Sequence, residues 1–109
     1  MTGALVVLST IGSAEEASRV ANALVERGLA ACVSVLPGLT SVYRWEARVQ
    51  TETEFLMVIK TTAQAFEPLR EALLALHPYE VPEILALPVA DGHPPYLAWL
   101  TENVDARPG

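Results

Sequence analysis

Hydrophobic residues recur along the chain at two different spacings, which predict strands in some segments and helices in others. Residues 4–9 and 31–36 are short, mostly apolar runs with the length of buried strands. Between these runs, apolar residues at helical spacing form one stripe, made by Ala17, Val20, Ala21, Leu24 and Val25. Ser13 is a good N-cap, Glu16 occupies the capping-box position and Gly28 follows the last turn. We therefore expect a strand, a helix and a second strand here.

The middle of the chain predicts a long projecting strand followed by a deeply buried one. Residues 43–49 alternate apolar and polar side chains, which is the period of a half-buried strand. Residues 55–61 carry apolar side chains at both parities, which is typical of a strand deep in a sheet. A turn at residues 51–54 is expected to join these two strands, and Pro37-Gly38 is expected to break or bend the strand before them.

The last third of the chain predicts a helix, a strand and a short closing helix. Apolar residues at helical spacing predict a helix over residues 66–76, which ends where His77 precedes Pro78. Residues 83–89 read as a strand, and residues 94–103 as a helix that begins with prolines. With residues 31–36 and 43–49 counted as one strand bent at Pro37-Gly38, the order is strand, helix, strand, strand, helix, strand. This is the order of the ferredoxin-like split βαβ fold, βαββαβ with one added helix. Residues 1–109 are therefore expected to form a single α+β domain.

This order of elements leaves one face of the predicted sheet without helices. Right-handed crossovers place both main helices on the same face. The strands nevertheless lack the polar alternation that is expected when the other face meets water, as residues 5–8 and 84–87 show. A second copy of the chain is the simplest cover for that face.

Composition and charge narrow the range of partners. The chain is 51% hydrophobic and 18% charged, which favours some apolar contact with a partner. Its formal charge of −6 opposes phosphate binding, so nucleic acid is not an expected partner. No apolar run approaches the length of a membrane span, and we expect no membrane association. The single cysteine, Cys32, fits a reducing compartment, so a cytoplasmic protein is expected.

The segment HPYEVPE, residues 77–83, gathers donor groups that a transition metal uses. His77, Glu80 and Glu83 are suitable ligand types. Pro78 and Pro82 exclude a regular helix, however, and the two carboxylates face opposite ways in an extended chain. The segment is therefore interpreted first as a corner between a helix and a strand, with a metal site only if another subunit converges on it. Cys32, among alanine and valine, is expected to be a small core residue.

Several blocks of this sequence, taken in order, resemble the CutA divalent-cation tolerance family. They are AACV at residues 30–33, the pattern PG-TS-Y-W at 37–45, IKT at 59–61, HPYEVPE at 77–83 and PPYLAWL at 94–100. The resemblance implies a ferredoxin-like subunit in a tight homotrimer, in which an extended hairpin reaches a neighbour, as in PII-like signalling proteins. It also implies a link to copper and other divalent metals. Relatives credited with copper binding carry a cysteine and a second histidine where this chain has Ser9 and Leu76, and only His77 matches.

These observations give a set of candidate residues. The metal candidates are His77, Glu80 and Cys32, with Cu²⁺ or another divalent ion as a possible ligand and no required cofactor. Tyr43 and Trp45 on the alternating strand are expected to anchor a subunit interface. The cations that could line a cleft are Arg44, Arg48 and Lys60.

Two functions are compatible with the sequence, and neither is catalytic. The first is a homotrimeric protein that binds divalent metal ions, copper in particular, in the response to them. The second is a PII-like signalling module that binds a small anion in clefts between subunits, where the three cations could supply charge. No hydrolase elbow, phosphate-binding loop or redox Cys-x-x-Cys occurs, so no enzyme is expected.

Overall fold

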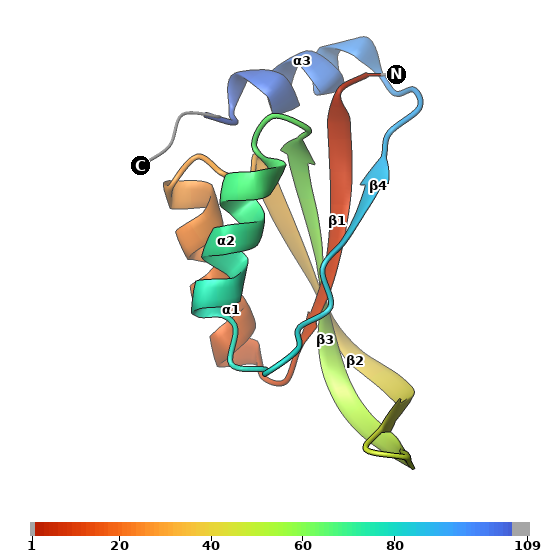
Figure 1. The fold of residues 1–109 in the computed structure, drawn as a ribbon. Coiled ribbons are helices and arrows are strands. Elements are labelled where there is room, and N and C mark those ends of the chain that lie inside the picture. Colours follow the sequence, from red (N-terminus) through yellow and green to blue (C-terminus); the bar gives the residue numbers. More distant parts are fainter. Residues whose placement is uncertain (1, 106–109) are drawn as a thin grey trace.

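The computed structural model describes residues 2–105, which fold into a four-stranded antiparallel sheet packed against helices (Figure 1). The elements are β1 (Ala4–Ile11), α1 (Ala14–Glu26), β2 (Cys32–Trp45), β3 (Arg48–Thr62), α2 (Phe66–Leu76), β4 (Leu85–Pro88) and α3 (Pro94–Glu102). The sheet order is β2-β3-β1-β4, and each pair of neighbouring strands is antiparallel. The predicted α+β, ferredoxin-like order of elements is confirmed.

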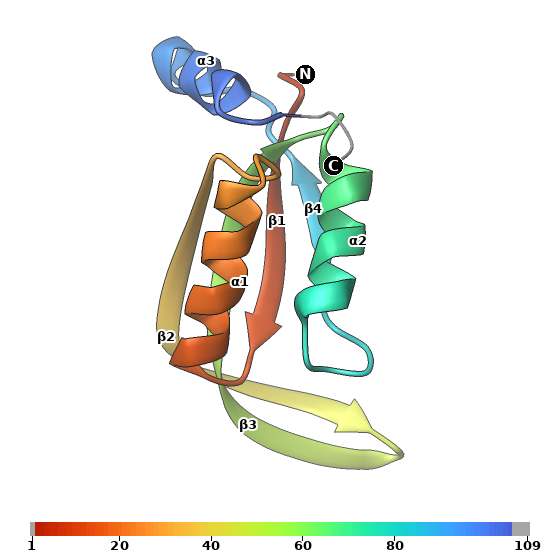
Figure 2. The same cartoon turned by 90° about the vertical axis from the view of Figure 1, so that its left-hand side faces the viewer.

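The two long helices, α1 and α2, lie side by side on one face of the sheet (Figure 2). The core between them and the sheet consists of fully buried side chains, chiefly Val7, Ile11, Val20, Leu24, Met57, Ile59, Leu69 and Leu73. The expected N-cap of α1 is present, because the Ser13 hydroxyl accepts a hydrogen bond from the backbone N–H of Glu16 at 3.2 Å. Of the apolar stripe that predicted α1, Ala17, Val20 and Leu24 enter this core, whereas Val25 is exposed.

The other face of the sheet is apolar and open. Because paired residues of antiparallel strands lie on the same face, the register places on it Val6, Leu8, Leu56, Val58, Leu85 and Leu87. We call these residues the open face. Leu85 and Leu87 are 57% and 48% exposed, whereas Val7, Met57 and Ile59 on the helix side are fully buried. The expectation of a sheet that is apolar on both sides is confirmed.

The β2–β3 hairpin projects beyond the rest of the sheet, at the end opposite α3 (Figure 1). Its turn is at Glu46 and Ala47, and Trp45 pairs with Arg48. The predicted turn at residues 51–54 is therefore wrong: Glu52 pairs with Ser41, and Glu54 pairs with Leu39. The predicted strand over residues 43–49 therefore spans the turn, and its alternation does not mark one face, because Val49 pairs with Arg44 and not with Trp45. The predicted bend at Pro37-Gly38 is confirmed by a shift in register between Leu36 and Leu39.

The hairpin turn uses two residues that are unfavourable for its backbone. Glu46 and Ala47 have φ values of 50° and 63°, a conformation that Asn-Gly adopts more easily. We expect the double variant Glu46→Asn/Ala47→Gly to raise the free energy of unfolding by about 1 kcal/mol. Denaturant unfolding at a fixed protein concentration measures this. The control Glu46→Gln should change the free energy of unfolding little, because glutamine disfavours positive φ as glutamate does. An Asn-Gly variant no more stable than wild type would contradict this interpretation of the turn.

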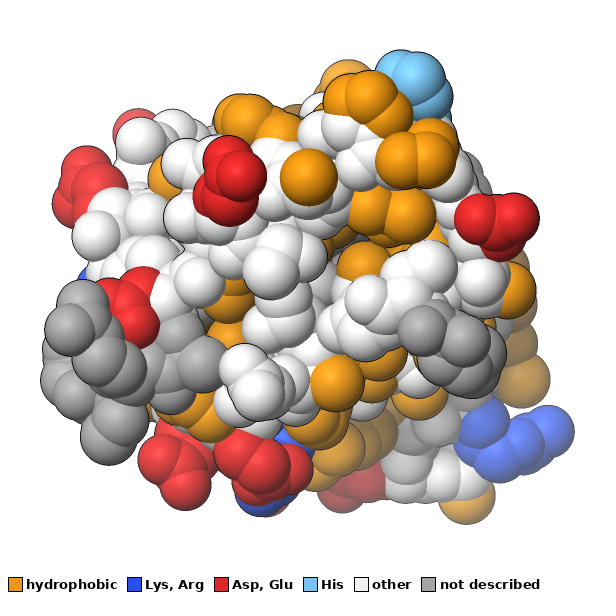
Figure 3. Space-filling model, turned by 90° about the horizontal axis from the view of Figure 1, so that it is seen from above, with side chains coloured by type: hydrophobic (Ala, Val, Ile, Leu, Met, Phe, Trp, Pro, Cys, Tyr) orange, Lys and Arg blue, Asp and Glu red, His pale blue; other side chains and the backbone are white. Residues whose placement is uncertain are grey.

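Helix α3 lies across the end of the sheet where β1 begins (Figure 1). Leu100 fixes the helix there and is 2% exposed, while Tyr96 and Trp99 pack against each other with ring centroids 5.5 Å apart and remain 44% and 42% exposed. Hydrophobic side chains are visible among polar ones on this end of the molecule (Figure 3). Among residues 2–105, no helix is long and apolar enough to cross a membrane.

Candidate functional site

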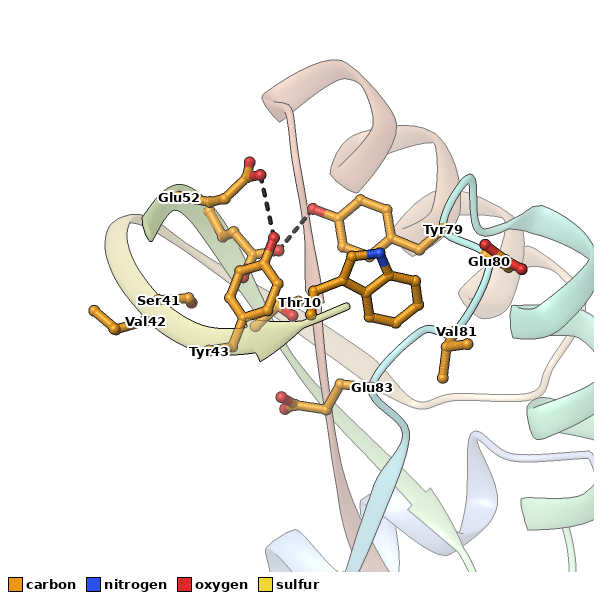
Figure 4. Close-up of a pocket in the computed structure, with 11 residues that line it drawn as sticks. Thr10, Ser41, Val42, Tyr43, Glu52, Tyr79, Glu80, Val81 and Glu83 are labelled. Atoms are coloured by element: carbon orange, nitrogen blue, oxygen red, sulfur yellow. Dashed lines mark hydrogen bonds between the residues drawn. The ribbon is translucent and has the colours of Figure 1, made fainter. Parts of the chain in front are cut away.

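A pocket of about 610 Å³ lies where the projecting hairpin meets the loop that follows α2 (Figure 4). The hairpin and β1 supply Thr10, Ser41, Val42, Tyr43, Trp45, Glu52 and Glu54, and the loop supplies Tyr79, Glu80, Val81 and Glu83. The loop cannot continue the helix, since Pro78 and Pro82 interrupt any helical path. It therefore runs past the base of the hairpin and closes one side of the pocket.

Two tyrosine–glutamate hydrogen bonds organise this pocket. The Tyr43 hydroxyl donates to Glu52 Oε1 at 3.1 Å, and the Tyr79 hydroxyl donates to Glu54 Oε2 at 2.6 Å (Figure 4). Loss of hydration raises the pKa of Tyr79 well above its ordinary value, and the hydrogen bond to Glu54 raises it further. The same two causes, with Glu52 as the acceptor, raise the pKa of Tyr43. Both phenols therefore remain protonated donors at neutral pH.

The pocket is acidic. Four of its lining residues are glutamates, and no lining residue is basic. Glu54 is 6% exposed, and the only ion pair in the described part of the chain joins Arg70 to Glu67 on α2. No cation of residues 2–105 therefore neutralises Glu54. Carboxylates that face a partly enclosed space raise the local concentration of cations and lower that of anions.

His77 lies beneath the pocket, where both of its ring nitrogens are already hydrogen-bonded. The ring is 7% exposed, with Nε2 2.7 Å from the carbonyl oxygen of Thr10 and Nδ1 3.1 Å from the backbone nitrogen of Tyr79. The carbonyl can only accept and the N–H can only donate, so the proton is on Nε2 and Nδ1 is the acceptor. No lone pair is left for a metal ion. His77 instead joins the end of β1 to the corner after α2, which agrees with the first interpretation of HPYEVPE.

The structure does not bring the three predicted metal ligands together. Glu80 lines the pocket, and His77 bonds to Thr10 near the end of β1. Cys32 pairs with Lys60, which pairs with Val6 near the start of β1. Within residues 2–105, no group of three His, Cys, Asp or Glu side chains is placed to hold a metal ion. The candidate donors of one subunit therefore do not form a coordination site.

The expected burial of Cys32 in the core is wrong for the single chain. Cys32 is partly exposed on the same face as the open-face residues, not on the helix side. Its Sγ lies 3.7 Å from Lys60 Nζ, which donates to the Ser34 hydroxyl at 2.7 Å. The alanine and valine neighbours in the sequence misled the prediction because alternate residues of a strand face opposite sides.

Ser9 and Leu76, the two positions that differ from copper-credited relatives, are both inside the subunit. Leu76 packs against the core, and its carbonyl accepts a hydrogen bond from Arg19 at 3.0 Å. Ser9 is completely buried on the helix side of β1. Its hydroxyl has no hydrogen-bond partner among the described residues.

The unpartnered Ser9 hydroxyl leads to a stability prediction. We expect Ser9→Ala to raise the free energy of unfolding by about 1 kcal/mol, because a buried hydroxyl without a partner is destabilising. Thr61→Val is the matched control: Thr61 is also fully buried, but its hydroxyl donates to the Leu29 carbonyl at 2.7 Å. The free energy of unfolding of this control should fall by about 1 kcal/mol. Thermal and denaturant unfolding of both variants measure the difference, and equal losses in both would contradict it.

The predicted interface anchors and the predicted cleft cations lie in different parts of the subunit. Tyr43 and Trp45, each 40% exposed, line the pocket. Arg44 and Arg48 belong to the strands beside the hairpin turn, while Lys60 lies with Cys32. None of these three cations lines the pocket, so no cationic cleft is formed within one subunit.

Sequence reasoning missed the carboxylates that the hairpin contributes. Glu52 and Glu54 lie in the segment that was expected to be a turn, and turn residues are normally solvated. The signal was the alternation Thr51, Glu52, Thr53, Glu54 in the sequence, which continues the period of the flanking strand.

The comparisons with known proteins agree with the fold. The family model described as CutA1 divalent ion tolerance protein matches residues 5–103. The divalent-cation tolerance protein CutA of Thermus thermophilus is 56% identical over 98 residues, which cover 90% of this chain and 95% of that protein.

Solved structures show the same subunit fold. The structure of the divalent cation tolerance protein Cut A1 of Thermus thermophilus superposes with a TM-score of 0.92 at 54% identity, covering 94% of this chain and 99% of that chain. The PII-like protein CutA from Nostoc sp. PCC 7120 superposes with a TM-score of 0.88 at 28% identity, with coverage of 94% and 99%. The match of fold, sequence and family model over nearly the whole chain places it in the CutA1 divalent ion tolerance family.

Proposed function

We propose that this chain functions as a non-catalytic homotrimer in the response to divalent metal ions. The observation that carries this proposal is the open face, a continuous set of aliphatic side chains that helices do not cover. Exposed apolar surface of this kind marks a protein interface. The role in metal response is supported by membership of the CutA1 family.

A closed ring of three subunits would both cover the open face and pair the free edges of the sheet. The outer strands are β2 and β4, and β2 runs for 14 residues with one edge unpaired in the single chain. An open edge of this length invites pairing with another chain. In a three-fold ring, each hairpin pairs with the next subunit and no edge remains to propagate. Tyr43 and Trp45 on the hairpin then act as anchors at the interface.

Size-exclusion chromatography with light scattering tests the assembly. Three subunits of 11.7 kDa are expected in one particle, at micromolar concentration and after dilution. A monomer or a dimer at micromolar concentration would overturn the proposed trimer. Because the measurement needs no added metal, it is independent of what the protein binds.

The metal interaction of a single subunit is expected to be weak. Soft and borderline ions such as copper prefer converging imidazole and thiolate donors. Here Cys32 and His77 are apart, and both nitrogens of His77 are occupied. Calorimetric titration of Cu²⁺ into chelator-treated protein tests this, with Cys32→Ser and Glu80→Gln as companion variants. Tight binding with one ion per subunit would overturn the expectation, while weak binding lowered by either substitution would support a shared site between subunits.

A PII-like ligand-binding module is the second candidate function. The pocket at the base of the hairpin favours it, because a partly enclosed space with aromatic and polar walls is the usual form of a small-molecule site. A thermal-shift screen of small metabolites on the assembled protein tests this candidate. The small anion expected from the sequence is disfavoured at this pocket, since its lining is acidic and contains no basic side chain.

A further inference from the structure

We infer that Lys60 of each subunit enters the pocket of a neighbouring subunit and forms an ion pair with Glu54 there. The inference rests on the proposed homotrimer and deepens it, because it names the residue that a second copy adds to the pocket. Two observations on one side of the sheet carry it: a half-buried cation without a carboxylate, and a buried carboxylate without a cation.

Lys60 is the first of these observations. It pairs with Val6 and with Cys32, so its side chain lies on the same side of the sheet as the open face. Its Nζ donates to the Ser34 hydroxyl at 2.7 Å and lies 3.7 Å from Cys32 Sγ, and no carboxylate of residues 2–105 forms an ion pair with it. The other strand cation on this side, Arg48, lies beside the hairpin turn. An ammonium group that a second copy covers requires an anionic partner, because burial of an unpaired charge is costly.

Glu54 is the second observation. It lies on the same side of β3 as Lys60, because residues an even number of positions apart in a strand face the same side. Glu54 is 6% exposed and accepts a hydrogen bond from the Tyr79 hydroxyl at 2.6 Å, but no cation of residues 2–105 pairs with it. Positions 54 and 60 are about 20 Å apart along the strand, so the two charges cannot meet within one subunit.

The distribution of charge along β3 complements a second copy of the chain. On its open-face side, β3 is acidic at Glu52 and Glu54, aliphatic at Leu56 and Val58, and basic at Lys60. In the proposed ring, the hairpin of one subunit lies against the next subunit and carries its carboxylates toward that subunit's open-face side. Opposite charges on two contacting surfaces favour this arrangement and fix its register. We assign Glu54 as the partner because it is buried, whereas Glu52 is exposed.

Carbodiimide cross-linking tests the contact directly. Lys60 is the only lysine of the chain. A zero-length carbodiimide joins an amine to a carboxylate in contact with it, so only Lys60 and the N-terminal amine can react. We expect covalent species with the mass of two or three subunits, and a digest in which mass spectrometry identifies Lys60 joined to Glu54. Lys60→Arg is the control, because it keeps the charge but has no reactive amine, and it should lose this link.

A double-mutant cycle measures how much the contact contributes to assembly. Lys60→Gln, Glu54→Gln and the double variant are compared by the concentration dependence of trimer dissociation in urea. We expect the two substitutions to be non-additive by a factor of about ten or more in the dissociation constant, because only the single variants leave an unpaired charge. Arg70→Gln and Glu67→Gln form the control cycle. Their ion pair on α2 is exposed and lies on the opposite side of the sheet, so its loss should change the dissociation constant little.

Light scattering on the same samples separates this inference from the proposed function. A trimer in which Lys60 links to a different carboxylate would overturn the ion pair and leave the proposed assembly intact. A trimer with no link between Lys60 and Glu54 and with an additive cycle would do the same. A monomer or a dimer would overturn the proposed homotrimer and this inference with it.

Discussion

Val58→Glu is expected to break the assembly into smaller species while leaving the subunit folded. Val58 lies in the middle of the open face, paired with Leu8 on one side and Ser34 on the other. A glutamate there would be buried without a cation in any interface formed by this face, at a penalty of about 3–5 kcal/mol per subunit. Light scattering measures the mass, and circular dichroism checks that the helices persist.

Ala75→Glu is the matched control for this experiment. Ala75 is exposed on α2, on the opposite side of the sheet, and glutamate is tolerated in a helix. This variant should keep the mass of wild type. A Val58→Glu particle with the full mass of three subunits would show that the open face is not the interface, and the function proposed for that face would lose its structural basis.

Most of the fold could be predicted because each element leaves a local signal. Neighbouring residues in the sequence determine the apolar stripe of α1, its Ser13 cap and the end of α2 at His77-Pro78. The open face was also predictable, since strands that are apolar at both parities need cover on both sides. These inferences depend on periodicity and capping, which the sequence displays directly.

The turn of the hairpin was misplaced for a physical reason. The sequence Glu46-Ala47 lacks the glycine or asparagine that normally marks a two-residue turn, although the backbone there has positive φ at both residues. The polar run Thr51 to Glu54 looked more like a turn. A projecting hairpin can be polar on both faces because little of it packs on the core, so polarity alone did not distinguish strand from turn.

The pocket could not be predicted because its parts are distant in the chain. Thr10, Glu54 and Tyr79 come together only when β1, β3 and the loop after α2 are assembled. The hydrogen bonds of His77 have the same origin: its partner Thr10 is 67 residues away. Residue type suggested a metal ligand, whereas the tertiary contacts assign His77 a structural role.

His77→Ala is accordingly expected to reduce stability strongly. The substitution leaves the Thr10 carbonyl and the Tyr79 N–H without partners and removes a buried ring that packs edge-on against Tyr79, with centroids 4.6 Å apart. Unpaired buried groups and the cavity together should lower the free energy of unfolding by about 2–4 kcal/mol. Urea unfolding at one protein concentration measures the loss, since subunit association also contributes to the apparent stability.

Two amide variants separate a structural role from metal binding. His77→Asn can keep an acceptor near the position of Nδ1, and His77→Gln can extend a donor toward the Thr10 carbonyl, so each should lose less stability than alanine. Copper affinity should change little among the three variants wherever the subunit remains folded, because neither ring nitrogen is free in the native state. An alanine variant that unfolds like wild type but no longer binds copper would reverse the assignment and make His77 a ligand.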